Sequence, residues 1–238
     1  MKILSLNAWH ATQRAELETL IRQQYDTTDI FCFQESDGDA IESLLGEIFA
    51  DDTFTKEVSI KTSSSDNDVL TSYVRNDMTV VRKVELLGQT GDDAGFIQVL
   101  HLQRDDVLFA IANVHGAPRP GDKLDTPGRI AQSQALIDEL ATCDGVRIAI
   151  GDFNLLPDVQ SVSMIEAAGY DNLITRYSIP TTRNELAWDR FPHNKQLFAD
   201  YAFVAGVSRV VSFTVPRVFA SDHLPMLLDI DLINKGAL

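Results

Sequence analysis

Short apolar or alternating segments, separated by turn-like residues, recur along the whole chain of 238 residues. These segments predict strands at 3–6, 29–34, 55–60, 69–75, 78–87, 96–103, 106–114, 146–150, 200–204, 208–215 and 225–232. Apolar residues at helical spacing interrupt them at 13–25, 38–50, 125–140 and 158–168, whereas residues 171–197 are irregular and polar. Strands that outnumber helices in this way favour a layered α+β fold with two sheets inside and helices outside. We expect one domain over residues 1–238.

The composition is that of a soluble globular protein, because 45% of the residues are hydrophobic and 23% are charged. The sequence has no apolar stretch long enough to span a bilayer, and the N-terminus does not resemble an export signal. We therefore expect a cytoplasmic protein without a transmembrane segment. The two cysteines, Cys32 and Cys143, form no disulfide framework and fit a reducing compartment.

The formal net charge of −15 disfavours a long polyanion as a partner, since nucleic-acid-binding chains usually carry a basic face. A bound divalent cation can reverse the sign of the local field, so the charge alone does not exclude such a substrate. We find no sequence sign of a protein partner and expect a monomer.

Six predicted strands begin or end in residues that carry chemistry. These are Asn7, Gln34-Glu35, Asn113-Val114-His115-Gly116, Gly151-Asp152-Phe153-Asn154, Asp200-Tyr201 and Ser221-Asp222-His223. A turn explains any one of them, because Gly, Asp and Asn are common turn residues. Their recurrence at six strand ends indicates a shared site.

The residue types at these ends suit metal-assisted phosphoryl transfer. Mg²⁺ takes oxygen ligands, which Asn7, Glu35 and Asp222 can supply. The reaction also needs a positioned water and stabilisation of charge. Asp152 is a candidate to orient or deprotonate that water, and Asn154 is a candidate to fix the phosphate.

Two histidines complete the candidate set. His223 needs a carboxylate to set its tautomer or its charge, and Asp200 is a candidate. His115 is suited to donate a hydrogen bond to a non-bridging phosphate oxygen. A purely structural histidine is the alternative at both positions.

The segments L-S-L-N-A-W, F-Q-E, N-V-H-G, G-D-F-N, A-D-Y and S-D-H-L-P, in that order, resemble the endonuclease/exonuclease/phosphatase superfamily with its DNase I-like fold. The resemblance extends from Asn7 to Pro225. It implies a four-layer α/β/β/α sandwich with two mainly antiparallel sheets, and a phosphoesterase that uses Mg²⁺, or Mn²⁺, and an activated water. The implied metal residues are Asn7, Glu35 and Asp222, and the implied catalytic residues are His115, Asp152, Asn154, Asp200 and His223.

Departures from the family pattern leave the substrate open. The first motif reads N-A-W rather than N-x-N, Gly116 follows His115 where relatives often have leucine, and Phe198 stands where an arginine is common. The alternatives are a nuclease, a hydrolase of a small phosphodiester or nucleotide, a phosphatase and a sphingomyelinase-type head-group phosphodiesterase. A non-catalytic binding module that retains the fold is the alternative to an enzyme.

Two polar segments are weaker candidates for substrate loops. Residues 181–196 contain Arg183, Asn184, Arg190, His193 and Lys195, for which an ordinary solvated loop is an equal alternative. Arg119, Lys123 and Arg129 form a second possible loop, for which the solvated alternative is favoured. His10 lies close to Asn7, but a role outside the pocket is favoured. Phe153 is expected to pack under the site.

Overall fold

The computed structural model describes residues 1–62, 68–89, 94–206 and 208–232. One sheet contains β1 (Lys2–Asn7), β2 (Ile30–Gln34), β3 (Phe54–Lys61), β4 (Asp68–Arg75), β11 (Ser208–Thr214) and β12 (Met226–Leu232). The other contains β5 (Thr79–Leu86), β6 (Phe96–Arg104), β7 (Val107–His115), β8 (Val146–Asp152), β9 (Asp171–Asn172) and β10 (Asp200–Ala205). The helices are η1 (Trp9–Ala11), α1 (Arg14–Gln24), α2 (Asp39–Ile48), α3 (Pro127–Leu140), α4 (Gln160–Ala167), α5 (Leu173–Arg176) and α6 (Glu185–Arg190).

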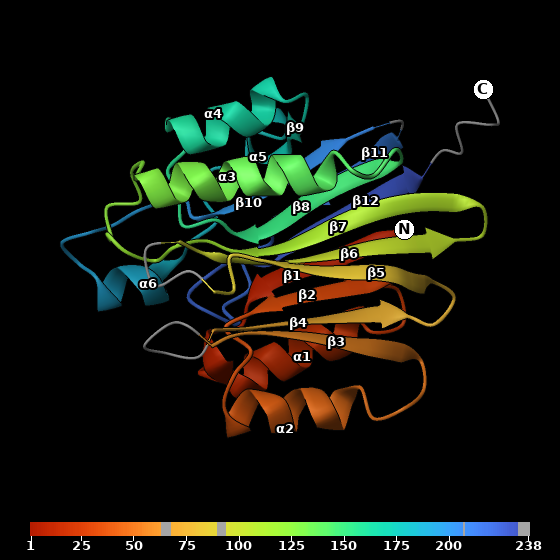
Figure 1. Ribbon diagram of the computed structural model, residues 1–238. Helices are drawn as coiled ribbons and strands as arrows, with labels where there is room; N and C mark the ends of the chain where they lie inside the picture. The colour runs from red at the N-terminus through yellow and green to blue at the C-terminus, as the bar shows by residue number, and fades with distance from the viewer. Residues whose placement is uncertain (63–67, 90–93, 207, 233–238) are drawn as a thin grey trace.

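The two sheets pack face to face, with α1 and α2 outside the first sheet and α3 and α4 outside the second (Figure 1). This four-layer sandwich confirms the expected fold class. The strand orders are β11-β12-β1-β2-β4-β3 and β5-β6-β7-β8-β10-β9. All predicted strands and helices are present, with bounds that differ by one or two residues from the sequence pattern.

The prediction that residues 171–197 are irregular is wrong in part, because β9, α5 and α6 lie there. These elements are two to six residues long and too short to show a hydrophobic period. Their sequence signal is the N-cap. The side chain of Asn172 accepts hydrogen bonds from the first turn of α5, and that of Asn184 accepts one from Leu186 in α6.

One parallel strand pair in each sheet positions the site. β1 runs parallel to β2 and pairs Asn7 with Gln34, the neighbour of Glu35. β7 runs parallel to β8 and pairs His115 with Asp152. β10 starts opposite the end of β8, so Asp200 pairs with Asp152 in antiparallel register. The carboxyl ends of the two parallel pairs therefore bring functional side chains from distant segments to one end of the sandwich, where α6 lies (Figure 1).

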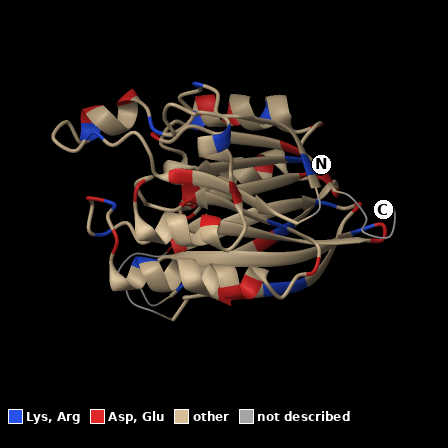
Figure 2. Cartoon of the chain, turned by 90° about the horizontal axis from the view of Figure 1, so that it is seen from above, with Lys and Arg blue, Asp and Glu red and all other residues tan. Residues whose placement is uncertain are grey.

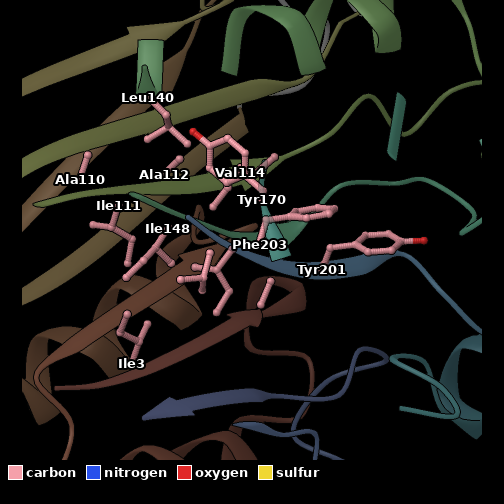
Figure 3. Close-up of a cluster of buried hydrophobic side chains, with 14 of the residues drawn as sticks. Ile3, Ala110, Ile111, Ala112, Val114, Leu140, Ile148, Tyr170, Tyr201 and Phe203 are labelled. Atoms are coloured by element: carbon pink, nitrogen blue, oxygen red, sulfur yellow. The ribbon is translucent and has the colours of Figure 1, made fainter. Parts of the chain in front are cut away.

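An apolar core and a small polar layer hold the sheets together. Figure 3 shows Ile3 of β1 on the side of the core that faces Ile111 and Ile148 of the second sheet. Nearer the site, Gln34 Nε2 donates to Asn113 Oδ1 at 2.6 Å, and Asn113 Nδ2 donates to the Phe33 carbonyl at 3.2 Å. Buried polar groups are costly unless they are paired, so these bonds favour one alignment of the two sheets.

Among the described residues, none of the helices combines the length and apolar character needed to cross a membrane.

Candidate active site

A cleft of about 660 Å³ opens at the end of the sandwich beside α6. Glu35, His115, Asp152, Asn154, Asp222 and His223 line it. Asn7 and Asp200 are buried, and both are linked to the lining residues by side-chain hydrogen bonds. The structure thus brings together all eight residues predicted for metal binding and catalysis. Their individual roles stay predictions.

The end of β8 and the turn that follows it aim the side chains of Asp152 and Asn154 at each other. Gly151 has φ of +142°, and a Cβ atom there would lie 2.2 Å from the Val114 carbonyl oxygen, so only glycine fits. Asp152 Oδ1 accepts from the Asn154 backbone N–H at 2.9 Å, and Oδ2 accepts from Asn154 Nδ2 at 3.3 Å. Phe153 points the other way, is fully buried and packs against two aromatic rings of β10, as expected from the sequence.

Asp152 is buried beside two cations, Lys123 and Arg183, and two histidines, His115 and His223. Burial by itself would raise its pKa, but His223, Lys123, His115 and Arg183 together hold the pKa well below the ordinary value. The carboxylate is therefore ionised and accepts hydrogen bonds. A carboxylate with a lowered pKa is a weak base, so Asp152 is better suited to orient a water molecule than to hold the proton of that water.

His223 lies between a carboxylate and a guanidinium. Its Nδ1 is 2.9 Å from both carboxylate oxygens of Asp200, and its Nε2 is 2.7 Å from Arg183 Nη1. Arginine has no acceptor, so this contact requires an unprotonated Nε2 and places the ring proton on Nδ1, facing Asp200. Arg183 Nη2 also donates to Asp222 Oδ2 at 2.9 Å.

Opposing influences act on the pKa of His223. Burial and Arg183 lower it, but Asp200, Asp152 and Asp222 raise it, and the net shift is upward. Burial raises the pKa of Asp200. Because Arg183 lowers the pKa of His223, withdrawal of this guanidinium would raise that pKa further and free Nε2 to accept a proton. Nε2 lies 3.5 Å from Asp152 Oδ2.

His115 is paired with an acid that the sequence pattern did not single out. Its Nδ1 is 2.8 Å from Asp68 Oδ1 at the start of β4, and its Nε2 is 3.7 Å from Glu35 Oε1. Burial would lower its pKa, but Asp68, Asp152 and Glu35 outweigh burial and raise the pKa to about 10. A protonated His115 can donate a hydrogen bond to an anion in the cleft.

The carboxylates of Glu35 and Asp152 converge on one amide. Asn7 Nδ2 donates to Glu35 Oε1 at 3.0 Å and to Asp152 Oδ2 at 3.1 Å. Two carboxylates this close favour a cation between them, and their oxygens are the ligands that Mg²⁺ and Mn²⁺ prefer. The donor set of the cleft therefore fits a divalent cation.

Two further features bear on which residues would hold that ion. Asn7 Oδ1 accepts from the Trp9 N–H at 3.0 Å, so Asn7 in this arrangement positions the two carboxylates. Side-chain ligand atoms of Asp152, Asp200 and His223 lie within 4.8 Å of one another and form a second possible ligand group.

Lys123 and Arg183, from the two weaker loop predictions, line the cleft as buried cations. Lys123 Nζ donates to Asn154 Oδ1, and burial lowers the pKa of its ammonium group. The expectation that Lys123 lies in an ordinary solvated loop is wrong. Its backbone φ of +59° and its place in a tight loop give no period from which burial could be predicted.

Arg129 is buried, yet it holds the loop rather than lining the cleft. Its guanidinium donates to the backbone carbonyls of Ala117, Pro120 and Leu124, at distances between 2.5 and 3.3 Å. These bonds keep the loop that carries Lys123 folded over the site. Arg119 lines the rim of the cleft.

The remaining candidates from residues 181–196 separate into two groups. Arg190 lines the cleft, and so does His10, contrary to the expectation of a role outside the pocket. Asn184 is buried outside the lining, where it caps α6 and donates to the Ser221 carbonyl at 2.8 Å. His193 is exposed and also outside the lining.

The chain forms two stacked sheets flanked by helices, and the strand ends gather carboxylates, histidines and amides in one cleft. This arrangement defines the DNase I-like class of folds. The chain belongs to the endonuclease/exonuclease/phosphatase family, whose model matches residues 4–223. A comparison with curated protein sequences finds no match.

Solved structures with the same fold cover nearly the whole chain. An endonuclease/exonuclease/phosphatase protein from Bacteroides vulgatus has a TM-score of 0.75 and 15% identity, and 98% of each chain is covered. The mannosyl-6-phosphatase Bt3783 from Bacteroides thetaiotaomicron has a TM-score of 0.75 and 16% identity over 97% of this chain and 99% of that one. The human Nocturnin catalytic domain with a bound sulfate anion has a TM-score of 0.75 and 18% identity over 98% of this chain and 94% of that one.

Proposed function

We propose that the protein is a metal-dependent phosphoesterase that hydrolyses a phosphate ester by attack of an activated water. The observation that carries the proposal is the joined group of Asp152, Asn154, Asp200 and His223 beside the buried cations of Lys123 and Arg183. Carboxylate and histidine can manage the water and its proton, while the cations neutralise a phosphate. Family membership supports this class of chemistry.

In the proposed reaction, the ionised Asp152 accepts a hydrogen bond from the attacking water, and Asn154 fixes a phosphate oxygen. Arg183 moves from His223 Nε2 to the incoming phosphate, and Nε2 then takes the proton of the water. Asp200 holds the opposite ring nitrogen and stabilises the imidazolium that forms. His115 and Lys123 donate hydrogen bonds to phosphate oxygens as negative charge develops there.

Glu35 and Asp222, with Asn7 in support, are the residues proposed to hold Mg²⁺ or Mn²⁺. When bound, such an ion polarises the phosphate and lowers the pKa of water.

A small phosphate ester is the proposed substrate class, in preference to long nucleic acid. The net charge of −15 opposes a long polyanion. Among the described residues in view in Figure 2, the lysines and arginines are dispersed between acidic residues and form no continuous band. The mannosyl-6-phosphatase and the sulfate-bound Nocturnin domain have the same fold, which supports a site for a small tetrahedral anion.

A phosphoesterase panel with Mg²⁺ and Mn²⁺ tests the proposal. It compares sugar phosphates, nucleotides, cyclic nucleotides, inositol phosphates, sphingomyelin, RNA and both forms of DNA. We expect metal-dependent hydrolysis of a small ester that is lost in Asp152→Asn and His223→Ala, each with an unchanged circular dichroism spectrum. Undiminished turnover in both purified variants would contradict the proposal.

A further inference from the structure

Both tryptophans of the chain lie in the lining of the same cleft. The sequence contains two, Trp9 after β1 and Trp188 in α6, and each lines the cleft together with Phe191 at the end of α6. Phe191 is 48% exposed, although a large apolar side chain would ordinarily be buried. Aromatic rings from distant parts of the chain are thus gathered next to the charged group that the proposed reaction uses.

A flat group already contacts two of these rings. The guanidinium carbon of Arg190 lies 5.6 Å from the centre of the Trp9 ring and 5.2 Å from the centre of the Phe191 ring. Guanidinium is planar and delocalised and stacks on aromatic faces. Arg190 thus occupies the position over the two rings that a planar ligand would take, so the ligand either displaces the guanidinium or stacks on it.

The backbone that carries Trp9 is strained. Trp9, His10 and Ala11 have φ of +47°, +53° and +57°, a region that costs roughly 1–2 kcal/mol for each non-glycine residue. The bond from the Trp9 N–H to Asn7 Oδ1, and that from the His10 N–H to the Glu35 carbonyl at 3.1 Å, hold this conformation. Such strain persists only where the surrounding structure holds it, and here two bonds join the backbone of Trp9 and His10 to Asn7 and Glu35 of the charged site.

Polar groups near the aromatic rings are engaged with the protein. Trp188 Nε1 donates to the Gln196 carbonyl at 2.9 Å, and the side-chain amides of Asn194 and Gln196 both donate to the Gly121 carbonyl. The first bond fixes the Trp188 ring, and the other two engage amide donors that could otherwise bind the hydroxyl groups of a sugar.

We propose that Trp9, Trp188 and Phe191 form a subsite for a planar heteroaromatic ring, such as a nucleobase, carried by the phosphate ester. This inference rests on the proposed function, because the phosphate of the same molecule is placed at Lys123 and Arg183. Stacking tolerates any base, since every base has a π face, so the subsite selects a ring rather than a sequence.

A matched pair of substrates tests the subsite. Adenosine 5′-monophosphate and ribose 5-phosphate carry the same phosphorylated sugar and differ in the base. We expect the wild-type protein to favour the nucleotide by about tenfold or more in kcat/KM, the scale of one stacked base. Phe191→Leu and Trp188→Leu, which remove a ring face, should reduce this ratio toward one by lowering kcat/KM for the nucleotide more than kcat/KM for ribose 5-phosphate.

Phe219→Leu is the matched control. Phe219 is 41% exposed and pairs with Arg217 at 5.8 Å, as Phe191 pairs with Arg190, but it lies outside the cleft lining. This variant should retain the wild-type ratio. If Phe219→Leu reduced this ratio as much as the cleft variants do, the effect would not depend on the cleft, and the inference would be overturned.

Binding without turnover separates the subsite from the proposed reaction. Because both tryptophans line the cleft, intrinsic fluorescence should change saturably with adenosine and stay constant with ribose. Hydrolysis of both phosphates at equal kcat/KM, with no fluorescence response to adenosine, would overturn the ring subsite and leave the proposed function intact. A saturable response to adenosine without hydrolysis of any ester in the panel would support the subsite and overturn the proposed function.

Discussion

Asp200 holds the His223 ring from one side, with both carboxylate oxygens 2.9 Å from Nδ1. The two residues are 23 positions apart, yet the start of β10 and the loop before β12 bring them into contact. A carboxylate there keeps the ring proton on Nδ1 and leaves Nε2 turned toward Asp152. Proton transfer at Nε2 in the proposed reaction therefore depends on Asp200.

We expect Asp200→Asn to lower kcat by about 10²- to 10⁴-fold, the range for a general acid–base group. The amide removes the charge that stabilises a protonated ring, and its NH₂ group can face Nδ1 and favour the other tautomer. Steady-state kinetics on the best substrate of the panel measure the loss. Asp26→Asn, at an exposed aspartate, is the control and should retain wild-type kcat. A kcat within twofold of wild type for Asp200→Asn would remove His223 from the proposed chemistry.

Lys123→Met should lower kcat/KM by about 100-fold, as expected for removal of one donor to a developing negative charge. The ammonium group is buried beside Asn154 and acts on Asp152, and it is proposed to meet the phosphate there. Lys56→Met makes the same substitution at an exposed lysine of β3. Equal kcat/KM in the two variants, with unchanged thermal unfolding, would show that Lys123 does not contact the substrate.

The strand ends could be predicted from the sequence because the spacing of apolar residues and the residue types of turns are local properties. Asn7, His115 and Asp152 stand directly at strand ends, and the parallel pairs of β1 with β2 and β7 with β8 bring those ends together. Asp68 and Lys123 could not be found in this way. Asp68 becomes a partner of His115 only when β4 packs beside β2, and Lys123 is buried only because its loop folds back over Asn154.

Arg129, in the first turn of α3, holds the loop that carries Lys123 and should matter for stability. We expect Arg129→Met to lower the free energy of unfolding by about 3 kcal/mol, since it removes a buried guanidinium and leaves the carbonyl groups of Ala117, Pro120 and Leu124 without their charged donor. Arg209→Met is the control, because Arg209 forms an exposed pair with Asp231 and such pairs contribute at most about 1 kcal/mol. Urea unfolding of both variants measures the difference. Losses of equal size would contradict the structural role of Arg129.

Glu35→Gln should raise the Mg²⁺ concentration needed for half-maximal activity by about tenfold or more. The substitution keeps the shape of the side chain but removes one of the two negative charges that converge on Asn7. Titration of the chelator-treated protein with Mg²⁺ and Mn²⁺ measures the shift. Glu42→Gln in α2, at an exposed carboxylate, should leave the titration unchanged. A Glu35→Gln curve that overlays the wild type would place the metal elsewhere, with the Asp152, Asp200 and His223 group as the next candidate.

Gly151→Ala tests whether the glycine at the end of β8 sets the position of Asp152. The added Cβ would meet the Val114 carbonyl oxygen at 2.2 Å, so β7 and β8 would have to separate where His115 pairs with Asp152. Gly169→Ala is the matched control, because Gly169 also has a positive φ, +89°, but has open space around it. We expect the control to lose about 1 kcal/mol of unfolding free energy from backbone strain alone. Gly151→Ala should lose about 2 kcal/mol more from the clash and should also lose activity, since Asp152 and Asn154 move with the strand end. Equal stability of the two variants, with activity retained in both, would show that the turn tolerates a side chain and does not set the position of Asp152.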